Sequence, residues 1–448
     1  MKYSVISVPS VVNFKDTELG PLPEEWRVVR LGEVGKVVTG RTPSTSESKY
    51  WNGAIPFITP VDLEGGSIHY AARSITQEGL KQAKPLPRGT VLVSCIGYIG
   101  KIGVIETDIA VTNQQINAII PHNCDNWFLA YALMQETEFL KSRARMTTVP
   151  ILHKTNFENI PIPLPPLAEQ RAIAHVLRTV QEAREATERV VAALRELKKS
   201  LMRHLFTYGP RGFTTENTEN TEKISVNSVR SVVNLKDTEI GPIPEHWQVV
   251  RLGEVAERPQ YGYTASASNA PVGPKFLRIT DIQDGKVFWP SVPFCQVAQS
   301  QIEHYLLKSG DILVARIGAT TGKTFLVAEC PPAIFASYLI RLRVAPEKGL
   351  LSDYLSYFTD TEAYWAQINS NKGGRLKQGI NIPILENLVI PLPPLPEQRE
   401  IARILQAVDR RIAAEEAYAR ALGELFKTLL HELMTGRRRV HIVEEGVP

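Results

Sequence analysis

The chain has 448 residues, of which 43% are apolar and 22% charged, with a formal net charge of +4. This length and composition predict a folded protein of two or three domains, and they exclude a disordered chain. No apolar run reaches the length of a membrane span, and the first residues lack the apolar core of a signal peptide. The four cysteines form no C-x-x-C pair, which suits a reducing compartment and argues against disulfides or a zinc site. We therefore expect a cytoplasmic protein without a membrane anchor or a bound metal.

Two blocks of the sequence occur twice. VVNFKDTELGPLPEEWRVVRLGEV from Val11 matches VVNLKDTEIGPIPEHWQVVRLGEV from Val232. FENIPIPLPPLAEQRAIAHVL from Phe157 matches LENLVIPLPPLPEQREIARIL from Leu385. The copies are 221 residues apart in the first block and 228 in the second. The pattern predicts a tandem duplication, with a net insertion of seven residues in the second copy.

The middles of the two copies, residues 35–155 and 256–384, diverge. Each contains short β-like runs between glycine, proline and asparagine turns, together with short helical stretches, which predicts a compact α+β domain. An aspartate after a strand-like run (Asp62 and Asp281) and a strand followed by a glycine turn are shared. Constant ends with variable middles suggest one scaffold carrying two specificities, and drift between two structural modules is the alternative.

Each second block leads into a predicted helix that opens at Ala168 and at Pro396, because the preceding PIPLPPL-type run must be extended. Apolar residues then alternate spacings of three and four, a heptad pattern. In the first helix these are Ile173, Val176, Val180, Ala183, Thr187, Val190, Leu194, Leu197 and Leu201; in the second they are Ile401, Ile404, Val408, Tyr418, Leu422, Leu425 and Leu429. Two such seams predict an intramolecular coiled coil, with packing against the globular domains as the competing use.

The chain lacks recognisable catalytic motifs. The glycines of Gly318-Ala-Thr-Thr-Gly322-Lys323-Thr324 enclose three residues, where a nucleotide-binding P-loop needs four. The matching turn of the first copy ends in Ile102, which offers no oxygen to Mg²⁺. A turn that delivers a lysine to DNA phosphate fits both copies better, and a plain structural turn is the alternative. There is also no glycine-rich cofactor loop after a strand, no methyltransferase tetrad and no nuclease cluster, so we expect a chemically inert chain.

These features together resemble the specificity subunits of type I restriction-modification systems. The matching segments are FKDTELGPLPEEWRVVRLGEV and its copy, Gly40–Ser44 (GRTPS), YWNGAIPFITPVDL from Tyr50, Ile99–Gly103, Thr112–Pro121 (TNQQINAIIP), Ala315–Lys323 and both ENxxIPLPPLxEQ-type exits. The second copy departs from the pattern, because it has YGYTASASN and FASYLIRLR in place of the GRTPS and TNQQ segments. This departure weakens residue-by-residue transfer to the second domain.

The resemblance implies an α+β fold with two target recognition domains in pseudo-twofold tandem repeat, separated by two long antiparallel coiled-coil helices. The expected divisions are a first recognition domain (1–167), a central spacer helix (168–208), a polar linker (209–231), a second recognition domain (232–395), a C-terminal spacer helix (396–435) and a basic tail (436–448). TENTENTEK in the linker indicates flexibility. The GRRR of the tail could touch phosphates, but a solvated helix end is the more common explanation.

The resemblance also implies a function and partners. The chain would bind double-stranded DNA sequence-specifically, at an interrupted target of two parts. Its protein partners would be two adenine methyltransferase subunits that use S-adenosylmethionine, and restriction/translocase subunits that use ATP and Mg²⁺, with no cofactor in this chain. We expect the partners to bind the helices and the repeated blocks, the surfaces that both copies share. The rival hypotheses are a coiled-coil scaffold that does not bind DNA and a stand-alone methylase or nuclease.

Candidate DNA contacts are polar and basic residues in the loops of the two middles. They are Arg41, Thr42, Ser44, Lys101 and Lys154 in the first domain, and Arg316, Lys323, Arg375, Lys377 and Gln378 in the second. Arginine and glutamine can read guanine and adenine edges, whereas lysine and hydroxyl groups more often hold phosphate. Asn113, Gln114 and Gln115 could read bases, but structural hydrogen bonding fits them better. Trp26 and Trp247 lie in the repeated block and are predicted to anchor the core.

Overall fold

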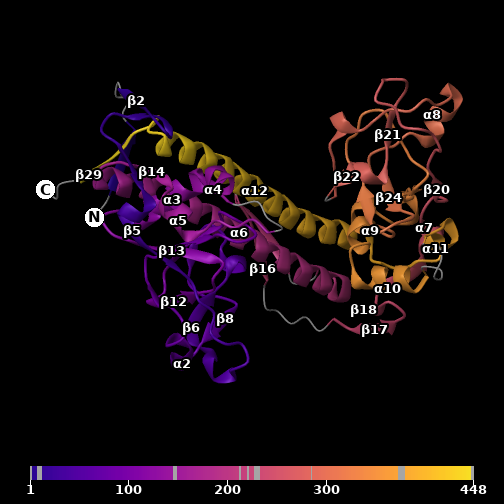
Figure 1. Cartoon of the computed structure of the whole chain (residues 1–448). Coiled ribbons are helices and arrows are strands. Elements are labelled where there is room, and N and C mark those ends of the chain that lie inside the picture. The colour runs from indigo at the N-terminus through magenta and orange to yellow at the C-terminus, as the bar shows by residue number, and fades with distance from the viewer. Residues whose placement is uncertain are drawn as a thin grey trace. The chain divides into compact units, whose positions relative to one another are not determined.

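The computed structural model describes residues 3–7, 13–144, 149–210, 213–218, 221–226, 233–283, 285–371 and 379–444. The chain divides into two compact units. Unit 1 comprises residues 1–189 and 415–448, and unit 2 comprises residues 190–414. Each unit holds one copy of the repeat together with part of each long helix (Figure 1).

The long helices are α6, Leu167–Tyr208, and α12, Leu395–Met434. In unit 1 the first turns of α6 pack against the last turns of α12, with Ile173 and Leu433 in one buried cluster. In unit 2 the last turns of α6 pack against the first turns of α12, with Leu205 and Ile401 in one buried cluster. The same helices therefore pair in opposite directions within each unit, which confirms the predicted antiparallel pair.

The predicted heptad seam is wrong in the middle of the helices. Val190 and Leu197 of α6 are 42% and 46% exposed, and Tyr418 and Leu425 of α12 are 55% and 45% exposed. The buried face of α6 instead includes Val191. A straight helix has 3.6 residues per turn, so its buried face drifts away from a strict seven-residue repeat.

Unit 1 is built around two sheets. The first has the order β5-β13-β10-β11-β7, and the second has the order β8-β6-β12-β9. The strands are β5 Gly35–Thr39, β6 Trp51–Ile58, β7 Ser67–Ile68, β8 Arg73–Ile75, β9 Leu86–Pro87, β10 Val91–Ser94, β11 Ile102–Ile105, β12 Ile109–Thr112 and β13 Ile116–Pro121. The short helices are α1 Leu31–Val34, α2 Gln77–Leu80, α3 Asn126–Gln135, α4 Thr137–Ser142 and α5 Lys154–Glu158, of which α3 packs on β10 and β11.

Unit 2 repeats this topology. Its main sheet has the order β20-β27-β24-β25, which matches β5-β13-β10-β11, and β21 pairs with β26 in parallel as β6 pairs with β12. The strands are β20 Gln260–Tyr261, β21 Lys275–Leu277, β22 Ile282–Gln283, β23 Lys286–Val287, β24 Ile312–Ala315, β25 Thr324–Leu326, β26 Ala333–Phe335 and β27 Leu339–Leu342. The helices are α7 Leu252–Val255, α8 Gln299–Tyr305, α9 Ser352–Phe358, α10 Glu362–Asn371 and α11 Ile382–Glu386. Two copies of one α+β domain are therefore confirmed.

The two repeated blocks of each copy meet in space. In unit 1, β4 (Arg27–Arg30) pairs antiparallel with β14 (Pro161–Leu164). In unit 2, β19 (Gln248–Arg251) pairs antiparallel with β28 (Val389–Leu392). A hairpin precedes each pair, formed by β2 (Phe14–Thr17) and β3 (Gly20–Pro23) in unit 1, and by β17 (Leu235–Thr238) and β18 (Gly241–Pro244) in unit 2. The two blocks of each copy therefore form one packed region at the start of a long helix, which we call the joint. It comprises β2, β3, β4 and β14 in unit 1, and β17, β18, β19 and β28 in unit 2.

A tryptophan is buried at the centre of each joint. Trp26 and Trp247 are both fully buried, which confirms that they anchor the core. The indole Nε1 of Trp26 donates to Glu169 Oε2 at 3.0 Å, and the indole Nε1 of Trp247 donates to Glu397 Oε2 at 2.8 Å. Each glutamate lies in the first turn of its long helix, where a negative charge is also stabilised by the helix dipole.

The glutamates have different second partners in the two units. In unit 1 the Arg439 guanidinium donates to Glu169 Oε2 at 3.0 Å and to Glu25 Oε2 at 3.0 Å. In unit 2 the Nε2 of His246, which replaces Glu25 in the repeat, lies 2.8 Å from Glu397 Oε1. The expected solvated end of the GRRR tail is therefore wrong for Arg439, which is 9% exposed.

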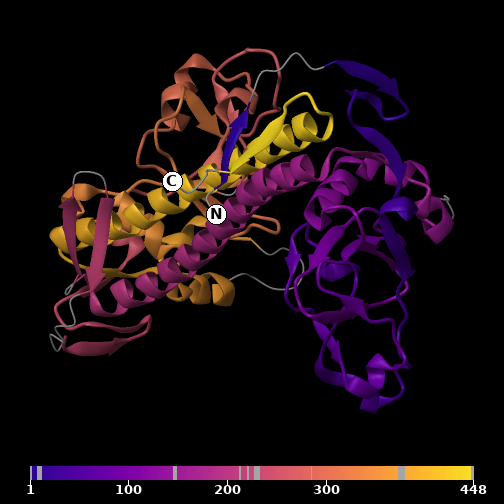
Figure 2. The same ribbon diagram turned by 90° about the vertical axis from the view of Figure 1, so that its left-hand side faces the viewer.

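Two strand pairs lie near the boundaries of the repeats. Strand β29 (Val440–Glu444) pairs antiparallel with β1 (Tyr3–Ser7), seen in Figure 2 as the yellow and indigo strands that lie together. Within the stretch predicted as a flexible linker, β15 (Phe213–Thr218) and β16 (Thr221–Val226) form an antiparallel hairpin. The threonine, isoleucine and valine residues of this stretch favour extended backbone, a preference that its polar composition concealed.

In the described part of the chain, we find no helix with both the length and the apolar character that crossing a membrane requires.

Replacing Arg439 with alanine should lower the free energy of unfolding by about 3 kcal/mol, because it leaves the buried Glu169 carboxylate without its cation. The matched control is Arg438→Ala, which removes a half-exposed arginine paired with Glu432 and should cost less than about 1 kcal/mol. Urea denaturation of the three proteins measures the difference. Equal losses in both variants would show that the buried pair is no more important than a surface pair.

Candidate nucleic-acid interface

Four loop segments of unit 1 lie side by side along one edge of the domain. The amide of Arg41 donates to the carbonyl of Thr112 at 2.9 Å, which joins the GRTPS segment to the TNQQ segment. The amide of Cys95 donates to Gln115 O at 2.7 Å, which joins the TNQQ segment to the glycine turn between β10 and β11. The amide of Leu152 in turn donates to Cys95 O at 2.8 Å. Segments far apart in sequence therefore form one continuous edge.

Unit 2 repeats this edge with different residues. The amide of Tyr263 donates to Phe335 O at 2.8 Å, and the amide of Arg316 donates to Tyr338 O at 2.9 Å. The amide of Ile380 donates to Arg316 O at 2.9 Å. The YGYTASASN and FASYLIRLR segments thus occupy the places of GRTPS and TNQQ, so the backbone scaffold is retained where the side chains diverge.

The structure brings the predicted residues of unit 1 to this edge. Arg41, Ser44 and Lys101 are exposed, and Thr42 donates from its hydroxyl to Gln114 Oε1 at 2.7 Å. Lys154, at the start of α5, is exposed and pairs with Glu158 at 3.3 Å. Because that pair is exposed, phosphate can compete for the lysine at little cost.

The amides of the TNQQ segment make structural hydrogen bonds. Asn113 Nδ2 donates to Gln115 Oε1 at 2.9 Å, and the Gln115 amide donates to Asn113 Oδ1 at 3.1 Å. These side chains shape the loop beside the glycine turn, in agreement with the structural role predicted for them.

In unit 2 the described candidates are Arg316 and Lys323. The guanidinium of Arg316 lies 4.7 Å from the centre of the Tyr261 ring, and this contact orients a half-buried arginine at the edge. Lys323 is exposed at the end of the glycine turn. Arg375, Lys377 and Gln378 lie outside the described residues.

Exposed aromatic residues also lie at the edge, and they were not among the predicted DNA contacts. Tyr98, at the tip of the first glycine turn, is 79% exposed, and the Lys101 ammonium lies 5.9 Å from the centre of its ring. Tyr338, beside Arg316, is 55% exposed. An aromatic residue inside a glycine turn, G-Y-I-G, was the available signal, because such a ring has no core to enter.

The glycine turn between β24 and β25 does not have the form of a nucleotide-binding loop. The amide of Gly322 donates to Ala315 O at 2.9 Å and that of Lys323 donates to Thr320 O at 2.9 Å, so both amides are engaged within the turn. Gly318 and Gly322 have φ of +86° and +93°, which a tight turn requires. The Lys323 side chain, by contrast, is exposed at this turn.

The cysteine thiol near the edge and the potential metal ligands are not arranged for catalysis or metal binding. Burial raises the pKa of the Cys95 thiol to about 12, so this thiol stays protonated and is no nucleophile at neutral pH. Among the described residues, no three histidine, cysteine, aspartate or glutamate side chains are placed to hold a metal ion. The exposed groups at the edge are suited to binding.

Comparison with known proteins agrees with this duplicated, divergent edge. The sequence profile of the family described as "Type I restriction modification DNA specificity domain" matches residues 23–195 and again residues 244–421. The chain belongs to this family. Together the two matches contain both glycine turns, and each match extends into a long helix. The family model therefore covers Trp26 and Trp247 as well as the loop segments of each edge.

Two relatives in this family are similar along nearly the whole chain. The type I restriction enzyme MjaVIII specificity subunit of Methanocaldococcus jannaschii is 29% identical, with 96% of each chain covered. The MjaIX specificity subunit of the same organism is 26% identical, covering 95% of this chain and 96% of the relative. Among solved structures, the S subunit of a type I restriction-modification system from M. genitalium covers 96% of this chain and 98% of its own, with a TM-score of 0.60. At 13% identity this likeness shows the fold alone.

Replacing Arg316 with alanine should weaken binding to the half-site read by unit 2 by about 1–3 kcal/mol if the guanidinium reads a base. Fluorescence anisotropy with duplexes altered in one half-site at a time measures this effect. Lys348→Ala, which removes an exposed cation of the same unit from the 3-10 turn Pro346–Lys348, should leave affinity unchanged. Equal weakening on every duplex would instead mark Arg316 as a phosphate contact, and no weakening would remove it from the interface.

Proposed function

We propose that this chain is the DNA-reading specificity subunit of a type I restriction-modification complex. Each unit reads one half of an interrupted double-stranded target. The observation that carries the proposal is the recognition edge, which has the same four-segment backbone in both units and different side chains at its surface. One scaffold with two sets of exposed groups is what reading two different sequences requires.

The exposed apolar residues of the helices support protein partners. Val190 and Leu197 on α6 correspond to Tyr418 and Leu425 on α12 at the 228-residue spacing of the repeat, and all four are more than 40% exposed. Apolar side chains kept exposed at equivalent positions favour a partner that binds twice. We infer two methyltransferase subunits, joined in the complex by restriction/translocase subunits.

The chain itself supplies recognition and no chemistry under this proposal. S-adenosylmethionine would be held by the methyltransferase subunits, and ATP and Mg²⁺ by the restriction/translocase subunits. Two observations support the assignment of recognition to this chain and of chemistry to its partners. The amides of the glycine turns already donate hydrogen bonds within the protein, and the Cys95 thiol stays protonated.

Exchanging residues 35–155 for the matching segment of a relative should change one half of the target and leave the other half unchanged, because the joint and the second edge are untouched. Mapping methylated adenines in genomic DNA, with the native and the exchanged gene, displays both halves. The reciprocal exchange of residues 256–384 is the matched control and should change the other half. A change spread over both halves would show that the units do not read independently.

The purified chain alone should show no methyltransferase, ATPase or nuclease activity, and it should bind duplex DNA with an affinity that falls as salt concentration rises. Radiolabelled methyl transfer, phosphate release and plasmid cleavage test the first expectation. Turnover that a point substitution in this chain abolishes would contradict it, and an absence of salt-dependent DNA binding would favour a scaffold.

A further inference from the structure

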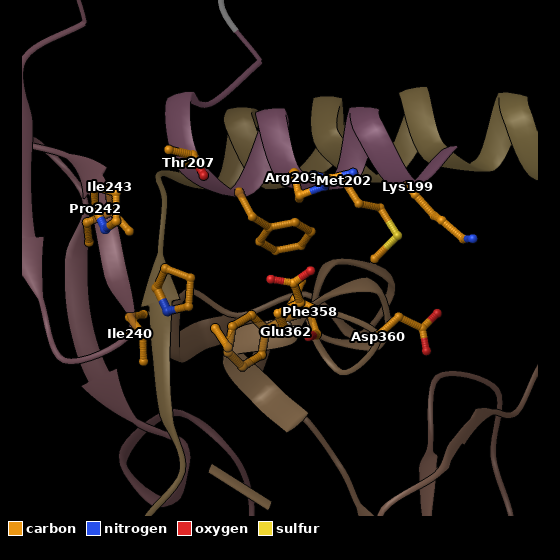
Figure 3. A pocket seen from close by; sticks show the side chains of 14 residues that line it. Lys199, Met202, Arg203, Thr207, Ile240, Pro242, Ile243, Phe358, Asp360 and Glu362 are labelled. Atoms are coloured by element: carbon orange, nitrogen blue, oxygen red, sulfur yellow. Dashed lines mark hydrogen bonds between the residues drawn. The ribbon is translucent and has the colours of Figure 1, made fainter. Parts of the chain in front are cut away.

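A cavity of about 290 Å³ opens in unit 2 where the last turns of α6, the hairpin β17–β18 and the α9–α10 connection meet (Figure 3). Its lining is largely apolar, with Met202 and Phe206 from α6, Ile243 from β18 and Phe358 from α9. The cavity lies on the joint, away from the divergent edge that carries the recognition segments.

Charged groups surround this apolar cavity. Lys199 and Arg203 extend from α6, and Asp360 and Glu362 lie across from them (Figure 3). The Lys199 ammonium forms an ion pair with the Glu196 carboxylate at 2.7 Å. Asp360, in contrast, has no hydrogen bond or ion pair to its carboxylate from the described residues. Burial raises the pKa of Asp360, while the charge of Lys198 lowers it and that of Asp409 raises it. Lys198 is itself paired with Asp409 at 2.7 Å.

The same chemistry occurs at the corresponding positions of unit 1. At the 228-residue spacing of the helices, Lys199, Met202, Arg203 and Phe206 correspond to Lys427, Leu430, His431 and Met434. In the α9–α10 connection, Asp360-Thr361-Glu362 corresponds to Glu136-Thr137-Glu138. Burial raises the pKa of Glu136 also. The exposed recognition residues diverged between the copies, whereas these positions retained basic, acidic or apolar side chains.

A contact in unit 1 brings the corresponding elements together. In unit 1, Gln135 Nε2 lies 3.3 Å from His431 Nδ1, so the last turns of α12 lie against the α3–α4 connection as those of α6 lie against the α9–α10 connection. One position differs, because Ala363 of the cavity corresponds to the bulkier Phe139. An acid beside the last turns of a long helix is therefore the feature that both units share most closely.

We propose that the cavity of unit 2 and the corresponding surface of unit 1 are a repeated docking site, at which each of two copies of one protein partner places a lysine or arginine beside an apolar side chain. The cation pairs with Asp360 in unit 2 and with Glu136 in unit 1. The inference rests on the proposed function, in which two methyltransferase subunits bind the shared surfaces of the chain.

The chemistry of the site selects a protein over DNA. The cavity lining holds two basic and two acidic side chains, so it offers phosphate no net positive charge. A carboxylate beside an apolar cavity fits the charged head and apolar stem of a basic side chain. The apolar lining takes a neighbouring anchor residue, as is usual at the centre of protein interfaces. A site present once in each unit fits a partner that is present twice.

The test measures how many methyltransferase subunits of its own system the full chain binds, by native mass spectrometry and by titration. We expect two on the unaltered chain, and one on Asp360→Lys or on Glu136→Lys, with at least a ten-fold loss of affinity at the altered site. Asp360→Lys combined with Glu136→Lys should reduce affinity at both sites. Asp360→Glu, which installs the residue of unit 1, should retain two subunits.

Glu347→Lys, the same type of charge change at an exposed position of unit 2, should also retain two subunits and serves as the matched control. Specific DNA affinity of each variant reports whether the recognition domains remain folded, and the milder Asp360→Asn and Glu136→Gln must weaken docking if the lysine variants unfold. Two subunits bound with unaltered affinity by Asp360→Lys and Glu136→Lys would overturn the docking site while the proposed function stands. An unaltered chain that binds no methyltransferase subunit would overturn both.

Discussion

The hydrogen bond from a buried tryptophan to the first glutamate of a long helix is the contact on which each unit depends. Trp26 and Glu169 form it in unit 1, and Trp247 and Glu397 form it in unit 2. An indole N–H and a carboxylate are both costly to bury alone, so each requires the other. The contact ties the first repeated block to the helix that follows the second block, and the recognition segments occupy the chain between these two points.

The duplication, the α+β class and the pairing of the two long helices were predictable because they rest on long patterns, whereas the antiparallel orientation followed from the family resemblance. Two near-identical blocks around Trp26 and Trp247 do not arise by chance, and a proline-rich run before a heptad pattern predicts where a helix begins. Local pairing was less predictable. The buried position of Arg439 depends on Glu169, 270 residues away in the sequence, and no pattern around GRRR contains that partner. The exposure of Val190 and Tyr418 likewise follows from the drift of a real helix, which a strict heptad ignores.

At the recognition edge, too, some features could be predicted from the sequence and others could not. The positions of Arg41, Lys101 and Arg316 on exposed loops followed from polar segments between strands. Their neighbours did not, because backbone hydrogen bonds between distant segments place Tyr98 at the surface and Tyr261 under the Arg316 guanidinium. Sequence therefore predicted the charged groups of the edge better than the aromatic groups that accompany them. The scaffold beneath is uniform, which allows the exposed groups to change without loss of the fold.

The way the chain is divided between the units affects the order in which they can form during synthesis. Unit 2 is continuous, residues 190–414, whereas unit 1 combines residues 1–189 with residues 415–448. On the ribosome, the unit whose synthesis begins first is therefore the last to be completed. Its Glu169 and Ile173 remain without Arg439 and Leu433 until some 260 further residues have been added. Until then the apolar face of α6 in unit 1 is open to wrong associations, so elongation rate and chaperone supply bear on unit 1 more than on unit 2.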